Sequence, residues 1–377
     1  MKPATKSKLG FWAILIRTIN IFVLLALLFS ILGCFVSPET NWYLAFFAIA
    51  HPYIALLNFF FVVYWILMKK RFLWIPLVSM VFALPITART FNLGNHNGET
   101  PEDNFKVMTY NVHVFDRYDA KFEEAGQARD SILSYVKSES PDVVCFQEFF
   151  SSDKKNEKNL KLFQKNLQMD TFVNVRYSDT KARNFYLVIF SRFPIISSGV
   201  VEGIKDSTVN FGVYADIQLD GKKIRVYSIH LQSIKLYTEQ NLFTENYKMS
   251  DKEDAKLVAK GTEKIARKMK RAYIQRAKQI DILARHIKAS PYPVIVCGDF
   301  NDTPTSYSYT KISKGKKDAF LESGFGMGNT YNGPFPSFRI DHILHHPKLK
   351  AYEYSIGKID YSDHFPVSCY FSFKEDE

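Results

Sequence analysis

One stretch of the chain reads Val294-Ile-Val-Cys-Gly-Asp-Phe-Asn301, a short apolar run followed by polar residues. Short apolar runs bounded by turn-forming residues are typical of buried β-strands. Asp299 and Asn301 follow the run directly, and α/β proteins commonly place functional groups at such strand ends. The stretch therefore predicts a strand with candidate functional side chains at its end.

The same design recurs along the chain. The other polar strand ends are Asn111 in Thr-Tyr-Asn, Glu148 in Phe-Gln-Glu, His230 in Ser-Ile-His, Asp341 in Arg-Ile-Asp, and Asp363 with His364 in Ser-Asp-His. A single such carboxylate more often caps a helix or forms a turn, and a single histidine is usually structural. As a set, their oxygens suit Mg²⁺, Mn²⁺ or Ca²⁺, and histidine beside aspartate suits acid–base chemistry. This combination favours hydrolysis at phosphorus.

Apolar runs alternate with amphipathic stretches after residue 104, which predicts an α/β domain. Helices are expected at 122–138 and 257–289. Strands are expected at 105–111, 143–147, 187–191, 213–219, 224–230, 294–298, 340–344 and 367–373. No C-x-x-C spacing suggests a zinc or redox site, so the four cysteines are expected to be buried free thiols.

The ordered motifs Tyr-Asn-Val, Gln-Glu, Ser-Arg-Phe-Pro-Ile, Ile-His-Leu, Gly-Asp-Phe-Asn, Arg-Ile-Asp and Ser-Asp-His resemble those of the endonuclease/exonuclease/phosphatase family. The resemblance covers about residues 104–373. It extends to the deoxyribonucleases and sphingomyelinases of that family. It implies a four-layer sandwich, with two β-sheets face to face and helices outside, and a metal-dependent phosphoesterase site at one rim.

The resemblance also implies roles. Glu148 would be the principal Mg²⁺ ligand, with Mn²⁺ or Ca²⁺ as alternatives, and Asn111 and Asp363 would assist. His364, oriented by Asp341, would be catalytic. The remaining roles would fall to Asp299 at the attacking water, Asn301 at the phosphate, and His230 as a second catalytic histidine. Which group acts as base and which as acid stays open.

Two positions depart from the family pattern. His113 stands where some relatives place an acid, so it is expected either to alter the set of metal ligands or to be a histidine at the surface or behind the ligands. Tyr186 stands where relatives often have glycine, which is expected to narrow the groove.

The net charge of +11 lies mostly near the N-terminus, where residues 1–92 hold eight bases and one acid. Long apolar runs occupy 18–36, 42–68 and 72–88, the last short and containing two prolines. About 20 apolar residues span a bilayer as a helix, so this region is expected to be a transmembrane anchor. We expect an anchor at 1–91, a linker at 92–104 and a catalytic domain at 105–377.

Basic residues precede the first run, and Lys69-Lys70-Arg71 follow the second. The positive-inside rule places both segments in the cytoplasm, so three spans would leave the catalytic domain outside it. If the third run does not span, the orientation reverses.

The segment 233–290 carries 14 bases and seven acids, with apolar residues near helical spacing. It is interpreted either as a basic helix near phospholipid headgroups or, preferably, as a helix with one packed face and one solvated basic face.

The function favoured by these observations is a membrane-anchored, metal-dependent phosphoesterase acting on lipid headgroups or small phosphate esters. An extracytoplasmic nuclease is the alternative, and a non-enzymatic binding module on the same fold is a third. The preferred metal, the substrate and the oligomeric state are left open by the sequence.

Overall fold

The computed structural model describes residues 10–94, 98–116, 126–151, 158–176, 185–201, 211–234, 252–333 and 338–374. The chain divides into two compact units, Met1–Thr90 with Thr305–Tyr307, and Phe91–Pro304 with Ser308–Glu377. Parts of several predicted segments lie outside the described residues, among them 1–9 of the anchor, 95–97 of the linker, 122–125 of the first helix and 235–251 of the basic segment.

The N-terminal unit is helical, with α1 (Phe11–Gly33), α2 (Tyr43–Ile49), α3 (His51–Leu67) and α4 (Trp74–Thr87). Of these, α1 is long and apolar enough to cross a membrane. The predicted run 42–68 forms two helices, α2 and α3, bent by 66° at Ala50, and Pro52 lies in the first turn of α3 where proline is tolerated. The third run forms the short helix α4.

Polar side chains in this unit point inward and large apolar ones point outward. Trp65 Nε1 donates to Asn20 Oδ1 at 2.9 Å, and the ring of His51 hydrogen-bonds Ser30 and Thr87. Those contacts join α1, α3 and α4. The large apolar side chains on the outer surface include Phe22, Leu67 and Phe82, each more than 60% exposed. A water-soluble helical bundle has the opposite arrangement.

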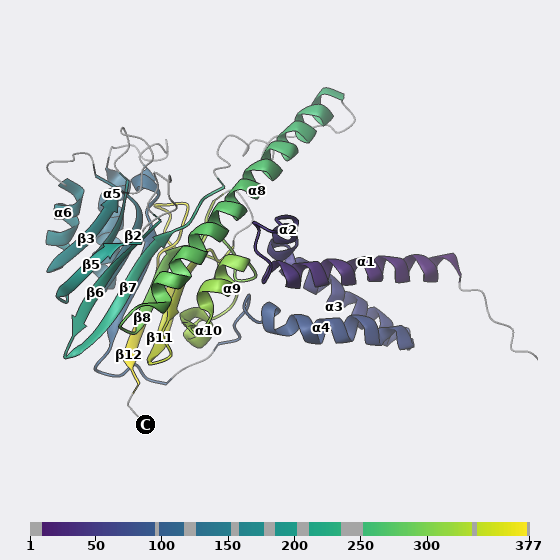
Figure 1. Cartoon of the computed structure of the whole chain (residues 1–377), viewed down its shortest axis with the longest axis horizontal. Coiled ribbons are helices and arrows are strands. Elements are labelled where there is room, and N and C mark those ends of the chain that lie inside the picture. The colour runs from purple at the N-terminus through teal and green to yellow at the C-terminus, as the bar shows by residue number, and fades with distance from the viewer. Residues whose placement is uncertain are drawn as a thin grey trace, which may run out of the picture. The chain divides into compact units, whose positions relative to one another are not determined.

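The second unit contains two six-stranded sheets. Figure 1 shows them as neighbouring layers. The first has the order β11 (Leu349–Ile356), β12 (Val367–Phe373), β1 (Phe105–Asn111), β2 (Val143–Phe150), β4 (Phe185–Ser191) and β3 (Thr171–Arg176). The second has the order β5 (Ile195–Val200), β6 (Gly212–Leu219), β7 (Lys222–His230), β8 (Val294–Asp299), β10 (Asp341–His345) and β9 (Lys317–Asp318).

The inner faces of the two sheets pack into one buried core. It joins Val107, Cys145 and Ile189 of the first sheet to Val226 and Cys297 of the second, all fully buried. All four cysteines are buried free thiols, as expected. Helices cover the outer faces, so the predicted four-layer α/β sandwich is confirmed.

Different helices cover the outer face of each sheet. A cluster containing Ile132 and Val136 of α5 (Gln127–Glu139) and Phe163 of α6 (Lys158–Asn166) packs on Met108 and Phe146 of the first sheet. The long α8 (Lys252–Lys288) lies along the second sheet in Figure 1 and buries an apolar stripe in its C-terminal half. The C-terminal half of α8 therefore agrees with the preferred interpretation of the basic segment, a helix with one packed face and one solvated basic face. Two short helices, α9 (Tyr307–Ser313) and α10 (Ala319–Ser323), complete this side.

The strand directions bring the polar strand ends to one rim. β1 and β2 run parallel, as do β7 and β8, so their C-terminal ends meet. β10 runs antiparallel to β8, which places Asp341 beside Asp299, and His230 pairs with Asp299 from the other side. The register therefore assembles residues that lie far apart in the sequence.

Candidate functional site

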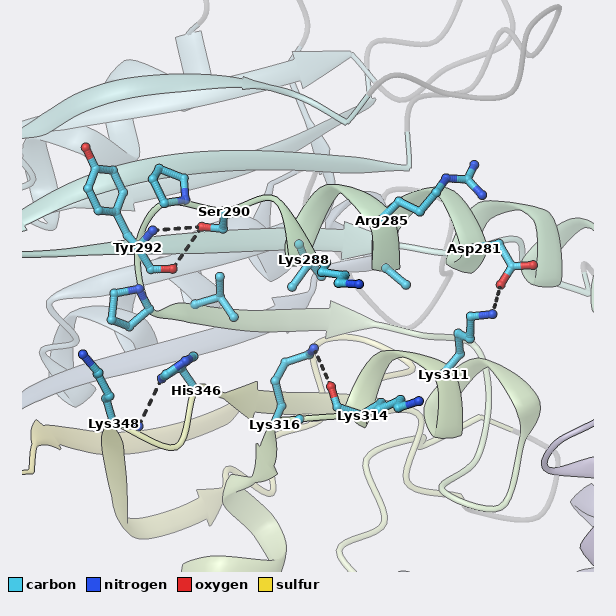
Figure 2. A pocket seen from close by; sticks show the side chains of 16 residues that line it. Asp281, Arg285, Lys288, Ser290, Tyr292, Lys311, Lys314, Lys316, His346 and Lys348 are labelled. Atoms are coloured by element: carbon cyan, nitrogen blue, oxygen red, sulfur yellow. Dashed lines mark hydrogen bonds and ion pairs between the residues drawn. The ribbon is translucent and has the colours of Figure 1, made fainter.

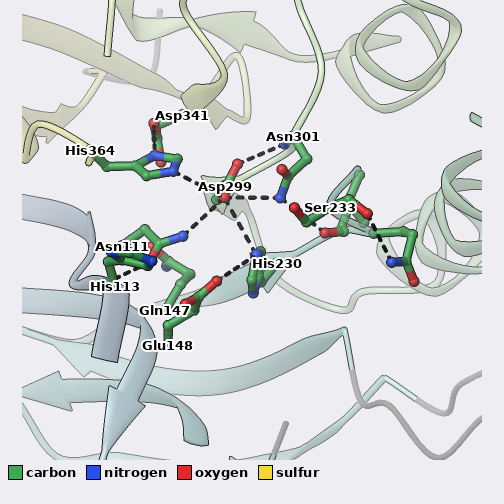
Figure 3. Close-up of polar contacts among 12 residues, drawn as sticks. Asn111, His113, Gln147, Glu148, His230, Ser233, Asp299, Asn301, Asp341 and His364 are labelled. Atoms are coloured by element: carbon green, nitrogen blue, oxygen red, sulfur yellow. Dashed lines mark hydrogen bonds and ion pairs between the residues drawn. The ribbon is translucent and has the colours of Figure 1, made fainter. Parts of the chain in front are cut away.

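Asp299 lies at the centre of the candidate site and is 1% exposed (Figure 3). Its carboxylate accepts hydrogen bonds from the Asn301 backbone N–H at 2.7 Å, from Asn301 Nδ2 at 2.9 Å and from Asn111 Nδ2 at 3.0 Å. Asn301 has a positive φ of 51°, which turns its amide back toward Asp299. Burial raises the pKa of Asp299 to about 6, although neighbouring His364 opposes the rise. Asp299 therefore titrates close to neutral pH.

His364 is a buried imidazole held by Asp341. Its Nδ1 lies 2.9 Å from Asp341 Oδ2, and its Nε2 faces Asp299 Oδ2 at 3.7 Å. Burial lowers the pKa of His364, but the carboxylates of Asp341 and Asp299 outweigh it and hold the pKa well above the usual value. The imidazole therefore carries a proton at neutral pH in this setting.

Backbone contacts fix both members of that pair. The hydroxyl of Thr330 accepts the backbone N–H of Asp341 at 3.0 Å. Ser362 Oγ donates to the Asn111 carbonyl at 2.8 Å and accepts the His364 N–H at 3.2 Å. Ser362 therefore ties the end of β1 to the His364 loop. Thr330 ties the start of β10 to the same loop, because its carbonyl accepts the Phe365 N–H at 2.7 Å.

Glu148 reaches the site because its strand is irregular. The pairing of β2 with β4 shifts register between Phe146 and Phe149, and Glu148 adopts a φ of 51°. Bulges of this kind re-aim a side chain next to active sites. Glu148 Oε1 lies 3.6 Å from His230 Nε2, which is itself 3.4 Å from Asp299 Oδ2. His230 therefore lies between carboxylates that come from the two sheets.

Asp363 lies at the outer side of the site. Its Oδ1 is 3.7 Å from His113 Nδ1 and 4.0 Å from His364 Nε2. Burial raises the pKa of Glu148; His113 opposes the rise, and the charge of Asp363 adds to it. His113 thus borders the candidate site, and whether it is a metal ligand or a histidine behind the ligands stays a prediction.

The structure brings together every residue of the predicted site: Asn111, Glu148, His230, Asp299, Asn301, Asp341, Asp363 and His364. Tyr186 instead belongs to the buried cluster on the outer face of the first sheet. Both amides donate to Asp299 and so position this carboxylate. Asn301 Nδ2 also donates to the Leu231 carbonyl, and Asn111 Oδ1 accepts the His113 N–H.

The sequence motifs did not single out several supporting residues. Gln147 is fully buried, and its Nε2 donates to Thr109 of β1 and to Ser228 of β7, which links the two sheets under the site. The ring of Tyr331 lies 5.5 Å from that of His364. Gln147 belongs to the Gln-Glu motif, which marks its position in the sequence. Thr330 and Tyr331 follow no strand-like run, so no sequence pattern marks them as site residues.

The donor set fits a hard divalent cation. Oδ1 of Asp341 and Oδ1 of Asp363 are buried without a hydrogen-bond partner among the described residues. Ligand atoms of Asp299, Asp341 and His364 lie within 4.8 Å of one another. Carboxylates crowded at one rim repel each other unless a cation offsets their charge, and oxygen ligands suit Mg²⁺ or Mn²⁺.

Comparisons with solved structures show the same fold. An endonuclease/exonuclease/phosphatase family protein from Bacteroides thetaiotaomicron matches at 20% identity with a TM-score of 0.51, covering 72% of this chain and 95% of that one. The catalytic domain of human Nocturnin matches at 15% identity with a TM-score of 0.52, covering 73% and 97%. A family protein from Leptotrichia buccalis matches at 16% identity with a TM-score of 0.50, covering 71% and 100%.

Sequence comparison gives the family. No curated protein matches the chain. Residues 13–90 match a model described as a domain of unknown function. Residues 108–364 match the model of the endonuclease/exonuclease/phosphatase family, which spans the candidate site from β1 to His364. The chain therefore belongs to the endonuclease/exonuclease/phosphatase family, whose members are phosphoester hydrolases.

Proposed function

We propose that this protein is a membrane-anchored, divalent-metal-dependent phosphoesterase. The observation that carries the proposal is the buried His364–Asp341 pair, which faces Asp299 at the rim where Glu148 and Asp363 also converge. An imidazole with a raised pKa opposite a carboxylate with a raised pKa supplies an acid and a base in one site.

In this proposal Asp299 takes the proton of the attacking water, because its pKa near 6 leaves it ionised at neutral pH. His364 keeps its proton and places positive charge near the phosphoryl oxygens, where it can protonate the leaving oxygen. Asp341 is a positioning residue that holds Nδ1 of His364. Asn111 and Asn301 orient Asp299, and their phosphate-binding role remains a prediction.

Glu148, Asp363 and Asn111 would hold the metal ion. A bound Mg²⁺ would offset the negative charge that develops on the phosphoryl oxygens. His230, between Glu148 and Asp299, would support both carboxylates or donate to the substrate.

We also propose that the N-terminal helices anchor the protein in a membrane. The apolar outer surface and polar interior of this unit support this placement, because polar residues in membrane helices face the bundle interior. With Lys69-Lys70-Arg71 in the cytoplasm and α4 as a third span, the catalytic domain would face the other side. A phosphatase reporter fused after Glu377 would be active only outside the cytoplasm, so an inactive fusion would contradict this orientation.

Anchoring favours a lipid headgroup or small phosphate ester as substrate. The test is hydrolysis by the full chain in detergent micelles with Mg²⁺, using a chromogenic phosphodiester, a phosphomonoester, a phosphoinositide, sphingomyelin, DNA and RNA. We expect His364→Ala to lose at least about 100-fold in turnover, while His346→Ala, directly after the far end of β10, keeps it. An active His364→Ala protein would contradict the proposal, and preferential cleavage of DNA or RNA would favour the nuclease alternative.

A further inference from the structure

A second concave site lies at the end of the second sheet opposite the candidate active site. This hollow of about 870 Å³ is lined by the last turns of α8, the start of β8, the end of α9 and the turn between β10 and β11. Lys288 and Lys316 reach into the same space in Figure 2. The basic residues that line it are Arg285, Lys288, Lys311, Lys314, Lys316 and Lys348. We call this hollow the basic pocket.

The charge of the basic pocket is largely uncompensated. Its one lining acid, Asp281, pairs with Lys311 at 3.0 Å. Across the described parts of the chain, no carboxylate lies in ion-pair contact with the other five cations. Each helix C-terminus contributes a partial charge of only about −0.5, so the ends of α8 and α9 do not balance them. Five of the six cations are solvent-exposed and Lys316 is half-buried, so water screens their mutual repulsion in part, and a bound anion would offset the rest.

Burial strengthens this argument for Lys316. Its ammonium donates to the Lys314 carbonyl at 3.2 Å, and burial lowers its pKa to about 8. Burial lowers the pKa of neighbouring His346, and the charges of Lys348 and Lys316 lower it further. A bound anion would relieve the repulsion that these groups share.

The pocket is separate from the catalytic rim. In the antiparallel pair of β8 and β10, Asp299 faces Asp341 at the catalytic end and Ile295 faces His345 at the pocket end. At about 3.4 Å per residue, the two ends lie about 14 Å apart along the strands. The pocket therefore offers a site in addition to the one that would perform hydrolysis.

We propose that the basic pocket binds a compact ligand that carries two or more phosphate groups. The volume lies within the range of small-molecule sites, about 300–1,000 Å³. Lysine amines act as point charges for phosphate. The cations converge on one hollow instead of tracking along a surface, which favours a compact polyanion over a nucleic acid strand. A free polyphosphorylated molecule and a phosphorylated lipid headgroup share this chemistry.

Calorimetric titration of the full chain in neutral detergent and metal-free buffer tests the proposal. Without metal, the carboxylates of the candidate active site repel anions, so the signal reports the basic pocket. The probes are inorganic tripolyphosphate, a short-chain phosphatidylinositol bisphosphate and a 20-nucleotide DNA. The pocket variant is Lys288→Gln with Lys316→Gln. The matched control, Lys260→Gln with Lys264→Gln, removes the same charge from the exposed part of α8.

We expect tripolyphosphate to bind, the pocket variant to weaken it at least tenfold and the matched control to leave it unchanged. Tighter binding of the soluble lipid would identify a headgroup as the ligand, and tighter binding of tripolyphosphate would identify a free polyphosphate. Equal weakening in both double variants, absence of binding, or tighter binding of DNA that the pocket variant weakens would overturn the proposal.

Discussion

His364 and Asp299 show how neighbouring groups set the chemistry of single residues. Each is buried, yet the carboxylates of Asp341 and Asp299 hold the pKa of His364 well above its usual value. Burial, with a smaller contribution from the charge of Asp341, raises the pKa of Asp299 to about 6. The same carboxylate at an exposed strand end would titrate near pH 4 and would be a poor base at neutral pH.

Replacing Asp341 tests this coupling. We expect Asp341→Asn to lower turnover by about 100-fold, because the imidazole loses the charge that keeps it protonated. The limb of the pH–rate profile that reports loss of the His364 proton should also move to lower pH. The exposed Asp103→Asn protein is the matched control. A lowered rate with an unmoved limb would show that Asp341 acts only structurally.

Glu322 offers a residue-scale test of stability. Burial raises its pKa, but hydrogen bonds from His345, Lys317 and the Ala351 N–H prevail and lower it to about 2 from 4.5. A lowered pKa contributes stability above pH 4.5 that is lost as pH falls through 2. With discounting for solvent screening, Glu322→Gln should cost about 1–2 kcal/mol at pH 7.

The measurement is the free energy of unfolding of both proteins between pH 7 and pH 2. The difference between them should shrink from pH 4.5 downward. A difference that stays constant across this range would contradict the role assigned to the Glu322 charge.

At this scale the sequence predicted much of the candidate site. The strand-end residues could be found because each follows an apolar run and belongs to an ordered motif, as Asp299 and His364 do. Thr330 and Tyr331 could not, because they reach the site through loop geometry. The catalytic and metal-binding roles remain predictions.

At the scale of elements, the strands that the sequence did not predict are the sheet edges. They are β3, β5, β9 and β11, whereas every expected strand lies inside a sheet. An edge strand has one neighbour and more exposure, so its apolar pattern is weak: β5 reads Ile-Ile-Ser-Ser-Gly-Val and none of it is buried. The sequence also does not predict the bulge at Glu148, because the pairing of β2 with β4 creates it.

Gly298 allows β7 and β8 to approach each other closely at the rim. It has a φ of 136°, and a Cβ there would collide with the Ile229 carbonyl of β7. We expect Gly298→Ala to cost about 2–4 kcal/mol, because both backbone strain and overpacking oppose it. Gly221→Ala is the control: its φ is 85° but nothing lies within 4 Å of its Cβ, so about 1 kcal/mol is expected. Equal losses in thermal unfolding would refute the close approach of β7 and β8.

At the scale of the whole molecule, charge and apolar surface divide the chain into regions with different roles. Most of the +11 net charge flanks the apolar N-terminal helices. This placement favours a role in orienting helices in a membrane over a role in binding nucleic acid. The basic segment divides again: the C-terminal half of α8 packs on the sheet and ends at the basic pocket. The sequence could locate this charge, but only the fold shows that lysines from three segments share one hollow.

The central claim is metal-dependent phosphoester hydrolysis at the rim that contains Glu148 and His364. The most direct test is the turnover of a chromogenic phosphodiester by the full chain as Mg²⁺ is titrated, with Glu148→Gln beside the exposed control Glu102→Gln. We predict saturable dependence on Mg²⁺, loss of at least about 100-fold in Glu148→Gln and no change in the control. Turnover that survives both chelation and Glu148→Gln would contradict the account.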